Sequence, residues 1–319
     1  MRAVVVDSHG GPDRLRVADV VTPSPLAGQV LVRLKVSGVN YLDVYQRSGA
    51  AAVPFVAGVE GVGVIESLGE SVQHLTVGMR VGWFSGGQGS FADYAVVQAD
   101  KAVPLPDDID DLVAVALLMQ GVTAHYLATD AYAVQPGDAA LVHAAAGGVG
   151  SLLTQIARLR GARVLGTASD AKAEVARGFG VEQVLPYDHF AEAARNLTGG
   201  EGVAVAYDGV GATTFEGSLS ALRTRGTLVL YGAASGPVPP FDLARLAPAG
   251  SVYITRPTVV HYTRTASEIR SRTEELFAWH RSGGLSVPPV HASPIGDIVS
   301  VFEALEGRRT SGKLALTHD

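Results

Sequence analysis

Short apolar runs separated by Gly and Pro make up the first hundred residues. The runs lie at residues 3–7, 29–40, 61–69, 80–84 and 91–98, and each has the length and composition of a β-strand. No segment with the apolar spacing of a crossover helix lies between them. Because parallel strands need such crossovers, the pattern predicts a largely antiparallel β domain.

The pattern changes near Asp107, where apolar residues begin to recur at helical spacing. A helical run covers residues 110–127, and strand-like and helix-like segments then alternate. Strands are predicted at 139–144, 162–169, 181–186, 203–211, 226–236 and 251–259, with helices at 151–160 and 170–180. This βαβα order predicts an α/β domain whose parallel sheet carries helices on both faces.

The last section of the chain opens with a long helical pattern at residues 265–281. Apolar segments follow at 299–305 and in KLAL at 313–316. We expect this section to return to the first domain. The predicted domains are therefore a catalytic domain of residues 1–121 with 263–319, and a nucleotide-binding domain of residues 122–262.

The composition indicates a globular protein. Of the 319 residues, 47% are apolar and 18% are charged, and the net charge of −6 disfavours a nucleic-acid or anionic-membrane partner. The chain has no cysteine, which excludes disulfides and thiolate metal sites. The opening MRAVVVDSHGG has the pattern of a first strand and not of a signal peptide. No stretch approaches the roughly 18 apolar residues of a membrane helix, so we expect a soluble, cytoplasmic protein.

The segment HAAAGGVG, residues 143–150, joins a predicted strand to a predicted helix. Within it, Ala145-x-Gly147-x-x-Gly150 matches the dinucleotide-binding fingerprint, with Ala in place of the first Gly. Gly147 lets the backbone approach a pyrophosphate, and Gly150 lets the helix pack close to the strand. The helix N-terminus then offers free N–H groups to the phosphates. The alternative is an ordinary tight turn, which the strand–helix–strand context disfavours.

The end of the next predicted strand bears on the choice between NAD and NADP. NAD sites place Asp or Glu there to bind the ribose 2′-hydroxyl. Here the strand ends near Ala168, and Asp170 lies two residues further, so the spacing alone leaves the choice open. Ser169 and Lys172 together supply a hydroxyl and a cation for a 2′-phosphate. The missing carboxylate and the nearby cation favour NADPH.

Several separated motifs carry a family resemblance. They are MRAVVVDSHGGPDRLRV at the start, GVNYLDVYQRSG at 38–49, HAAAGGVG at 143–150, YDGVG at 207–211, YGAASG at 231–236, SVYITRP at 251–257 and TSGKLAL at 310–316. In this order, and over essentially the whole chain, they resemble the zinc-free quinone oxidoreductase branch, related to zeta-crystallin, of the medium-chain dehydrogenase/reductase superfamily. The resemblance implies a GroES-like β domain, a Rossmann domain and a nicotinamide cleft between them. It also implies a homodimer formed through the edge of the nucleotide-binding sheet, for which SVYITRPTV is the candidate strand.

The resemblance also assigns roles to single residues. Asn40 and Tyr45 would flank the nicotinamide as catalytic candidates, with Asn40 bound to ribose or carboxamide and the Tyr45 hydroxyl bound to ribose or to the substrate carbonyl. Their structural alternatives are turn formation and packing. Thr123 would face the nicotinamide from a helix in which relatives often carry Lys where this chain has Gln120. The predicted cofactor contacts are Asn40, Tyr45, Thr123, Gly147, Gly148, Val149, Ser169, Lys172, Tyr187, Val210, Tyr231, Gly232, Ser235, Arg308 and Lys313.

The chain departs from the zinc-dependent members of the superfamily. Those members carry Gly-His-Glu and an earlier Cys ligand, whereas this chain has Gly58-Val59-Glu60 and Asn40. A catalytic zinc needs about three protein ligands, valine is not one, and none of the nine His lies in a recognisable ligand pair. We therefore predict no metal.

Without a metal, alcohol oxidation by hydride transfer is unfavourable, because no Lewis acid stabilises the alkoxide from which the hydride leaves. A quinone or activated alkene is already electrophilic, so positioning and water exclusion suffice. The predicted function is NADPH-dependent quinone reduction. One alternative is a 2-alkene (enone or enoyl) reductase. Another is a non-enzymatic NADPH-binding structural or RNA-binding protein, against which the acidic charge and the intact loop argue.

Overall fold

The computed structural model describes residues 1–318, which form two compact units. The first unit contains residues 1–119, 263–277 and 287–319, and the second contains residues 120–262 and 278–286. The second unit thus includes a segment, 278–286, that lies within the predicted catalytic domain. Two contacts explain the difference, because the Trp279 ring stacks on His125 at 5.6 Å and Gln155 accepts the Ser286 N–H at 2.7 Å. The domain limits drawn from the sequence stay a prediction.

The first unit is built from two sheets. Its strands are β1 (Arg2–Val6), β2 (Leu15–Asp19), β3 (Gln29–Val39), β4 (Phe55–Val56), β5 (Glu60–Leu68), β6 (Arg80–Trp83), β7 (Tyr94–Gln98), β8 (Val103–Pro104), β15 (Val290–Pro294) and β16 (Lys313–Thr317). One sheet has the order β15-β16-β3-β5-β6-β8, with β7 on β3, and the other has the order β2-β1-β4. All pairs except β15–β16 are antiparallel, so the predicted β domain is confirmed.

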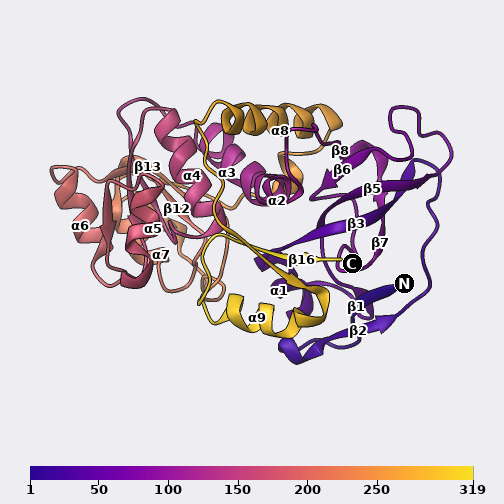
Figure 1. Ribbon diagram of the computed structural model, residues 1–319. Helices are drawn as coiled ribbons and strands as arrows, with labels where there is room; N and C mark the ends of the chain where they lie inside the picture. The colour runs from indigo at the N-terminus through magenta and orange to yellow at the C-terminus, as the bar shows by residue number, and fades with distance from the viewer. Residues whose placement is uncertain (319) are drawn as a thin grey trace. The chain divides into compact units, whose positions relative to one another are not determined.

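The C-terminal section returns to the first unit, as predicted. Strand β16 pairs antiparallel with β3, with Leu314 opposite Val39. Helix α9 (Ile298–Glu306) places Phe302 edge-on against Phe91, with ring centroids 6.2 Å apart. Figure 1 shows this yellow segment beside the indigo strands of the N-terminus. The pairing buries one continuous apolar core that includes residues from both ends of the chain.

A long helix covers the predicted helical run. Helices α2 (Asp111–Ala116) and α3 (Val122–Tyr126) are joined and extended by wider turns at Leu117–Gly121 and Leu127–Ala131. The resulting helix Asp111–Ala131 contains an 18-residue window with a mean hydropathy of 1.5, so by length and composition alone it could cross a membrane. The expectation that no stretch would reach that length was wrong. Because 72% of its most apolar window is buried inside the fold, it is a core helix.

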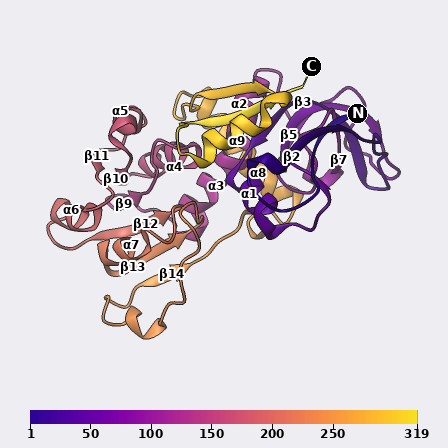
Figure 2. The same cartoon turned by 90° about the horizontal axis from the view of Figure 1, so that it is seen from below.

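The second unit has the Rossmann arrangement. Its strands are β9 (Ala139–Val142), β10 (Arg163–Thr167), β11 (Gln183–Leu185), β12 (Val203–Asp208), β13 (Leu222–Leu230) and β14 (Tyr253–Thr255), and its helices include α4 (Gly148–Leu159), α5 (Ala173–Gly178), α6 (Phe190–Leu197) and α7 (Phe215–Ala221). The sheet order is β11-β10-β9-β12-β13-β14 and all pairs are parallel. The predicted α/β fold, doubly wound around a parallel sheet, is confirmed. Figure 2 shows β14 at the edge of this sheet.

Two further helices lie outside the Rossmann sheet. Helix α1 (Tyr41–Tyr45) and helix α8 (Ala266–Arg281) belong mainly to the first unit. The sequence analysis did not predict α6 and α7, which are short. Their phenylalanines, Phe190 and Phe215, nevertheless lie in the core of the second unit. A helix of only seven or eight residues is too short to show a clear helical period.

Candidate active site

The loop after β9 has the geometry of a dinucleotide-binding loop. Helix α4 begins at Gly148, with Gly147 in an extended conformation as its N-cap. A Cβ on Gly150 would lie 2.3 Å from the carbonyl oxygen of Ala144, so only glycine allows the helix to start this close to the strand. This is the close packing predicted for Gly150. The N-terminal N–H groups of α4 are therefore brought to the carboxyl end of the sheet, where such folds bind phosphates.

A buried hydrogen-bond chain lies beneath this loop. Ser218 donates to Asp208 at 2.7 Å, so its Oγ accepts from His143 Nε2 at 2.9 Å, and His143 Nδ1 then accepts from Thr167 Oγ1 at 2.9 Å. Burial lowers the pKa of His143 to about 4, and the Asp208 charge offsets part of this effect. The imidazole is therefore neutral at pH 7. The chain links the ends of β9, β10 and β12 to α7.

Asp208 also organises the predicted contacts that follow β12 and β13. Its Oδ1 accepts the N–H groups of Val210 and Gly211, each at 2.9 Å. The Ser235 hydroxyl donates to the Val210 carbonyl at 2.8 Å and accepts the Thr213 N–H at 3.1 Å. These hydrogen bonds join two loops that hold the predicted contacts Val210, Tyr231, Gly232 and Ser235. The Ser235 hydroxyl donates within this structure, so its contribution is to hold the loops together.

The end of β10 carries the residues predicted to select the cofactor. Ala168 is buried, whereas Ser169 is exposed and begins a short helical turn that ends at Lys172. Burial lowers the pKa of Lys172, so an anionic partner would stabilise its charged form. Tyr187, after the neighbouring strand β11, is 39% exposed and stacks over the buried ring of His143 at 6.3 Å. Three of the predicted contacts thus lie at the carboxyl ends of adjacent strands.

In the first unit, two predicted contacts belong to a buried charged cluster. Lys313 Nζ donates to Glu60 at 2.5 Å and to the Asn40 Oδ1 atom at 3.0 Å. Asn40 Nδ2 donates to Glu60 at 2.9 Å, and the second Glu60 oxygen accepts the Met119 N–H at 2.7 Å. Lys313 and Glu60 have no exposed surface. Lys313 therefore neutralises Glu60 inside the fold, and its contact with the cofactor stays a prediction.

Asn40 is held within the same cluster, and its predicted contact with the cofactor stays a prediction. Asn40 is 7% exposed, and the oxygen and nitrogen of its side-chain amide both bind within the cluster. Its backbone N–H donates to Asp43 at 2.8 Å, which forms the N-cap of α1. The turn-forming alternative thus describes Asn40 in this structure. Burial raises the pKa of Asp43 to about 7, while the Asn40 hydrogen bond and the Lys313 charge act in the opposite direction.

By the resemblance, Asn40, Val59 and Glu60 correspond to the Cys, His and Glu of zinc-dependent members. Valine is not a metal ligand, and Glu60 is paired with Lys313. Among residues 1–318, no group of three His, Cys, Asp or Glu side chains is arranged to hold a metal ion. The donor set does not fit a catalytic zinc.

Tyr45 lies at the end of α1 on a firmly held segment. It is half-buried, and its ring is 5.8 Å from that of Tyr41. Two residues further, Arg47 is 1% exposed and donates to Glu306 of α9 at 2.6 Å. Burial raises the pKa of Tyr41 and the Arg308 charge lowers it, so the exposed Arg308 lies near this pair of rings. The first unit thus brings Tyr45 and Arg308 to one region.

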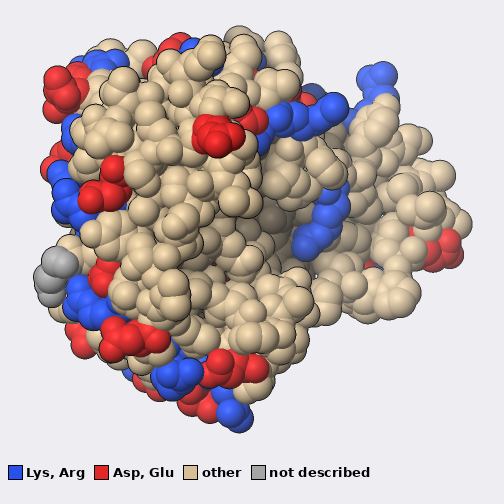
Figure 3. Space-filling model, turned by 90° about the vertical axis from the view of Figure 1, so that its right-hand side faces the viewer, with Lys and Arg blue, Asp and Glu red and all other residues tan. Residues whose placement is uncertain are grey.

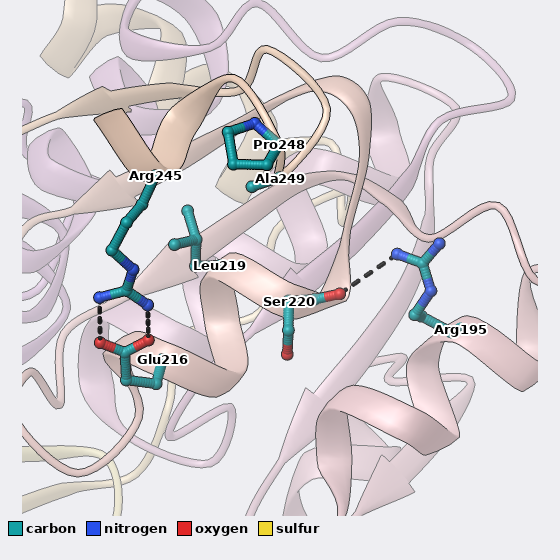
Figure 4. A pocket seen from close by; sticks show the side chains of 7 residues that line it. All are labelled: Arg195, Glu216, Leu219, Ser220, Arg245, Pro248 and Ala249. Atoms are coloured by element: carbon teal, nitrogen blue, oxygen red, sulfur yellow. Dashed lines mark hydrogen bonds and ion pairs between the residues drawn. The ribbon is translucent and has the colours of Figure 1, made fainter. Parts of the chain in front are cut away.

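The surface pocket drawn in Figure 4 lies in the second unit and has a volume of about 380 Å³. Its lining includes two arginines, which would suit an anion. Both are already engaged, because Arg245 binds Glu216 through two nitrogens and Arg195 donates to the carbonyl oxygens of Ser220 and Leu222. On the face seen in Figure 3, basic and acidic side chains are interspersed. We assign no function to this pocket.

Two family models match the chain. The alcohol dehydrogenase GroES-like domain covers residues 26–107, and the zinc-binding dehydrogenase model covers residues 148–279. Together with the two units described above, they define the class: a dehydrogenase or reductase that combines a GroES-like domain with a Rossmann domain.

Similar proteins narrow the class. The 2-haloacrylate reductase of a Burkholderia species is 37% identical over 98% of both chains, and the quinone oxidoreductase of Pseudomonas aeruginosa is 36% identical over 97% of both. A solved structure of a mycobacterial protein in complex with NADPH is 43% identical, covers 100% of both chains and has a TM-score of 0.96. The chain belongs to the medium-chain dehydrogenase/reductase superfamily, in its quinone oxidoreductase branch.

Sequence reasoning missed three groups of residues. It did not foresee the pairing of Glu60 with Lys313, the His143 chain or the Arg47–Glu306 ion pair. A sequence signal existed for the first, because Glu60 lies in an apolar strand and so needs a buried cation. The other two depend on partners far away in the sequence.

Proposed function

We propose that this protein reduces quinones with NADPH by hydride transfer, without zinc. The single observation that carries the proposal is the loop between β9 and α4, where Gly150 lets the N–H groups of the helix start at the carboxyl end of the parallel sheet. The cofactor of the mycobacterial relative and the activity of the Pseudomonas relative agree with it. The substrate is a small molecule.

NADPH fits the residues at the end of β10 better than NAD does. Ser169 and Lys172 lie on one turn, where a hydroxyl and a partly desolvated cation can bind a 2′-phosphate. Ala168, which stands where an acidic residue would bind the 2′-hydroxyl, is buried and apolar. Tyr187 covers this region from the neighbouring strand. Gly147, Gly148 and Val149 hold the diphosphate at the start of α4, and Thr123, Val210, Tyr231 and Gly232 line the remaining part of the cofactor site.

Bound NADPH supplies the hydride, and the chain positions and polarises the substrate. Tyr45 is the residue we assign to the substrate carbonyl, because its hydroxyl belongs to a helix held by Asn40, Asp43 and the Arg47–Glu306 pair. A donor at the carbonyl oxygen stabilises the negative charge that develops there. Arg308 supplies a positive charge near the same rings.

Reduction of activated alkenes is the second candidate. The specific observation in its favour is the 37% identity to a 2-haloacrylate reductase over almost the whole chain. Hydride addition to such an alkene is followed by protonation of the neighbouring carbon, so this reaction needs a proton donor as well as a carbonyl donor.

The test compares both reactions directly. NADPH oxidation is followed by its absorbance with an ortho-quinone and with a simple enone in parallel. Turnover of the quinone alone supports the proposal, and turnover of the enone alone transfers the assignment to alkene reduction. Tight NADPH binding with neither reaction would contradict both enzymatic functions and favour a structural role.

We also propose a cytoplasmic homodimer that binds no nucleic acid and no membrane. The net charge of −6 disfavours nucleic acid, and a filter-binding assay with RNA at low salt tests that part. The edge strand β14 is the surface we assign to the dimer, with Tyr253 61% exposed on it. Residues 1–121 with 263–319 would form the catalytic domain and residues 122–262 the NADPH-binding domain.

A further inference from the structure

Two polar residues of the second unit interrupt an otherwise buried stretch of helix. Between Ala114 and Ala128, every residue is buried except Gln120 and Thr123, which are partly buried. They are three residues apart, so their side chains lie on the same side of the helix. Helix α3, which contains Thr123, packs against α4, the helix of the dinucleotide-binding loop.

The side-chain amide of Gln120 lies against the first residue of α4. A Cβ on Gly148 would be 1.9 Å from Gln120 Oε1, 2.3 Å from Cδ and 2.4 Å from Nε2. The absence of a side chain at Gly148 therefore leaves room for this amide. Gln120 Oε1 is buried and has no hydrogen-bond partner among residues 1–318.

A buried carbonyl oxygen without a donor is unfavourable, and such atoms are nearly always paired in folded proteins. A ligand on this loop can supply the missing donor once the partly exposed Gln120 side chain turns its amide toward the ligand. The diphosphate cannot, because its oxygens carry no proton at neutral pH. The donors of NADPH are its ribose hydroxyls, the amino group of adenine and the carboxamide N–H groups of nicotinamide.

The sheet order indicates whether Gln120 lies nearer the adenosine half or the nicotinamide half of the cofactor. The adenosine ribose of a Rossmann site lies at the end of the second strand, here β10, on one side of β9. Helix α3 lies toward the other side, because it packs on the turn Val259–His261 that follows β14. The Tyr126 ring stacks on Tyr262 at 4.4 Å, which holds the helix there. Gln120 thus lies on the nicotinamide side.

We propose that Gln120 binds the nicotinamide riboside half of NADPH, with its Oε1 accepting a hydrogen bond from a ribose hydroxyl or from the carboxamide. The inference rests on the proposed NADPH-binding function. It gives Gly148 a second role, because that glycine makes room for the Gln120 amide as well as for the phosphates.

The first test replaces Gln120 with Met, which has a similar length and forms no comparable hydrogen bond. We expect Gln120→Met to raise the Kd for NADPH about ten-fold, the effect of one hydrogen bond. The Kd for 2′-phosphoadenosine 5′-diphosphate, which lacks the nicotinamide half, should not change. The matched control is Gln135→Met, because Gln135 is exposed and precedes β9 at the opposite end of that strand. It should leave both affinities unchanged.

The outcomes separate the two proposals. A wild-type protein that does not bind NADPH overturns the proposed function. If the wild type binds NADPH and Gln120→Met binds it equally well, only the role of Gln120 is overturned. An equal loss for both ligands also overturns it, because the contact would then lie outside the nicotinamide half.

A second test uses the close approach of Gly148 and Gln120. In Gly148→Ala, the new Cβ displaces the flexible end of Gln120, so we expect it to weaken NADPH binding. If this displacement is the cause, adding Gln120→Met to Gly148→Ala should produce no further loss. Losses that add in the double variant would overturn the link between the two residues.

Discussion

Lys313 carries a charge in the interior of the first unit, where a charge is stable only with a well-placed partner. Its partners are Glu60 and Asn40, and the Asn40 backbone in turn starts the helix that contains Tyr45. One lysine thus supports the segment to which the resemblance assigns the chemistry. In this structure its hydrogen bonds hold Asn40 and Glu60 in place.

Removal of the Lys313 charge alone should destabilise the fold more than removal of the Lys313 and Glu60 charges together. Lys313→Met leaves Glu60 buried and unpaired, so we expect it to lower the free energy of unfolding by about 3–5 kcal/mol. The double variant Lys313→Met/Glu60→Gln should recover much of that loss, because no uncompensated charge remains. Urea unfolding followed by circular dichroism measures both. An unchanged stability in Lys313→Met would contradict the cluster.

A single substitution can distinguish a chemical role of the Tyr45 hydroxyl from a packing role of its ring. Tyr45→Phe removes the hydroxyl and keeps the ring, so we expect kcat for quinone reduction to fall about ten-fold, the value of one hydrogen bond. The Kd for NADPH should change little if the hydroxyl acts on the substrate. Tyr41→Phe, which removes a hydroxyl from the neighbouring ring, is the control and should keep the wild-type kcat. Equal effects of both variants would argue against a special role for Tyr45.

At the scale of elements, the His143 chain joins secondary-structure elements that the backbone alone does not connect. Thr167 ends β10, Asp208 ends β12 and Ser218 belongs to α7, and the neutral imidazole bridges all three. The loops that hold the predicted cofactor contacts begin at these points. Their relative placement therefore depends on an imidazole that accepts at one nitrogen and donates at the other.

Protonation of His143 should destabilise this arrangement in acid. Its pKa is lowered to about 4 in the fold, whereas an unfolded chain takes up the proton near 6.5. Stability is therefore highest above pH 6.5 and falls as the pH drops toward 4, by about 3 kcal/mol in total. We expect His143→Asn to lose this dependence when urea unfolding is measured at pH 7 and pH 5. The exposed His189→Asn should keep the wild-type dependence, and a loss there would assign the effect elsewhere.

At the scale of the whole molecule, the sheet of the second unit ends in an edge strand that has a neighbouring strand on one side only. Strand β14 pairs with β13 on one side, and Tyr253 is 61% exposed. An edge strand presents unpaired backbone N–H and C=O groups, with which another chain can pair. A second copy of this chain is the partner that we propose.

A charge on this edge should therefore prevent assembly. In Tyr253→Asp, two like charges would meet across the two-fold axis, so we expect a monomer in light scattering where the wild type is a dimer. Val17→Asp, at a partly exposed apolar residue of the first unit, should remain a dimer. A wild-type monomer, or a dimeric Tyr253→Asp, would contradict the assignment of this interface.

The elements that the sequence predicted well are those with a strong local pattern. The alternating strands and helices of the second unit, the helical run at 110–127 and the return of KLAL to the first unit were confirmed. The expectation that no segment is apolar enough to span a membrane was wrong for that same helix. Its apolar residues are as frequent as those of a spanning helix, but they pack in a protein core. Hydropathy measures the residues and not their surroundings.

By itself the sequence determined the two fold types, the glycine loop after β9 and the absence of thiolate ligands, because each depends on neighbouring residues or on composition. Only the tertiary structure decided what the polar candidates contact. Lys313 lies 253 positions from Glu60 and 273 from Asn40, yet the pairing of β16 with β3 brings all three together in the core. Once enclosed there, the ammonium group is held by the nearest carboxylate, because an unpaired charge is very unfavourable in the interior.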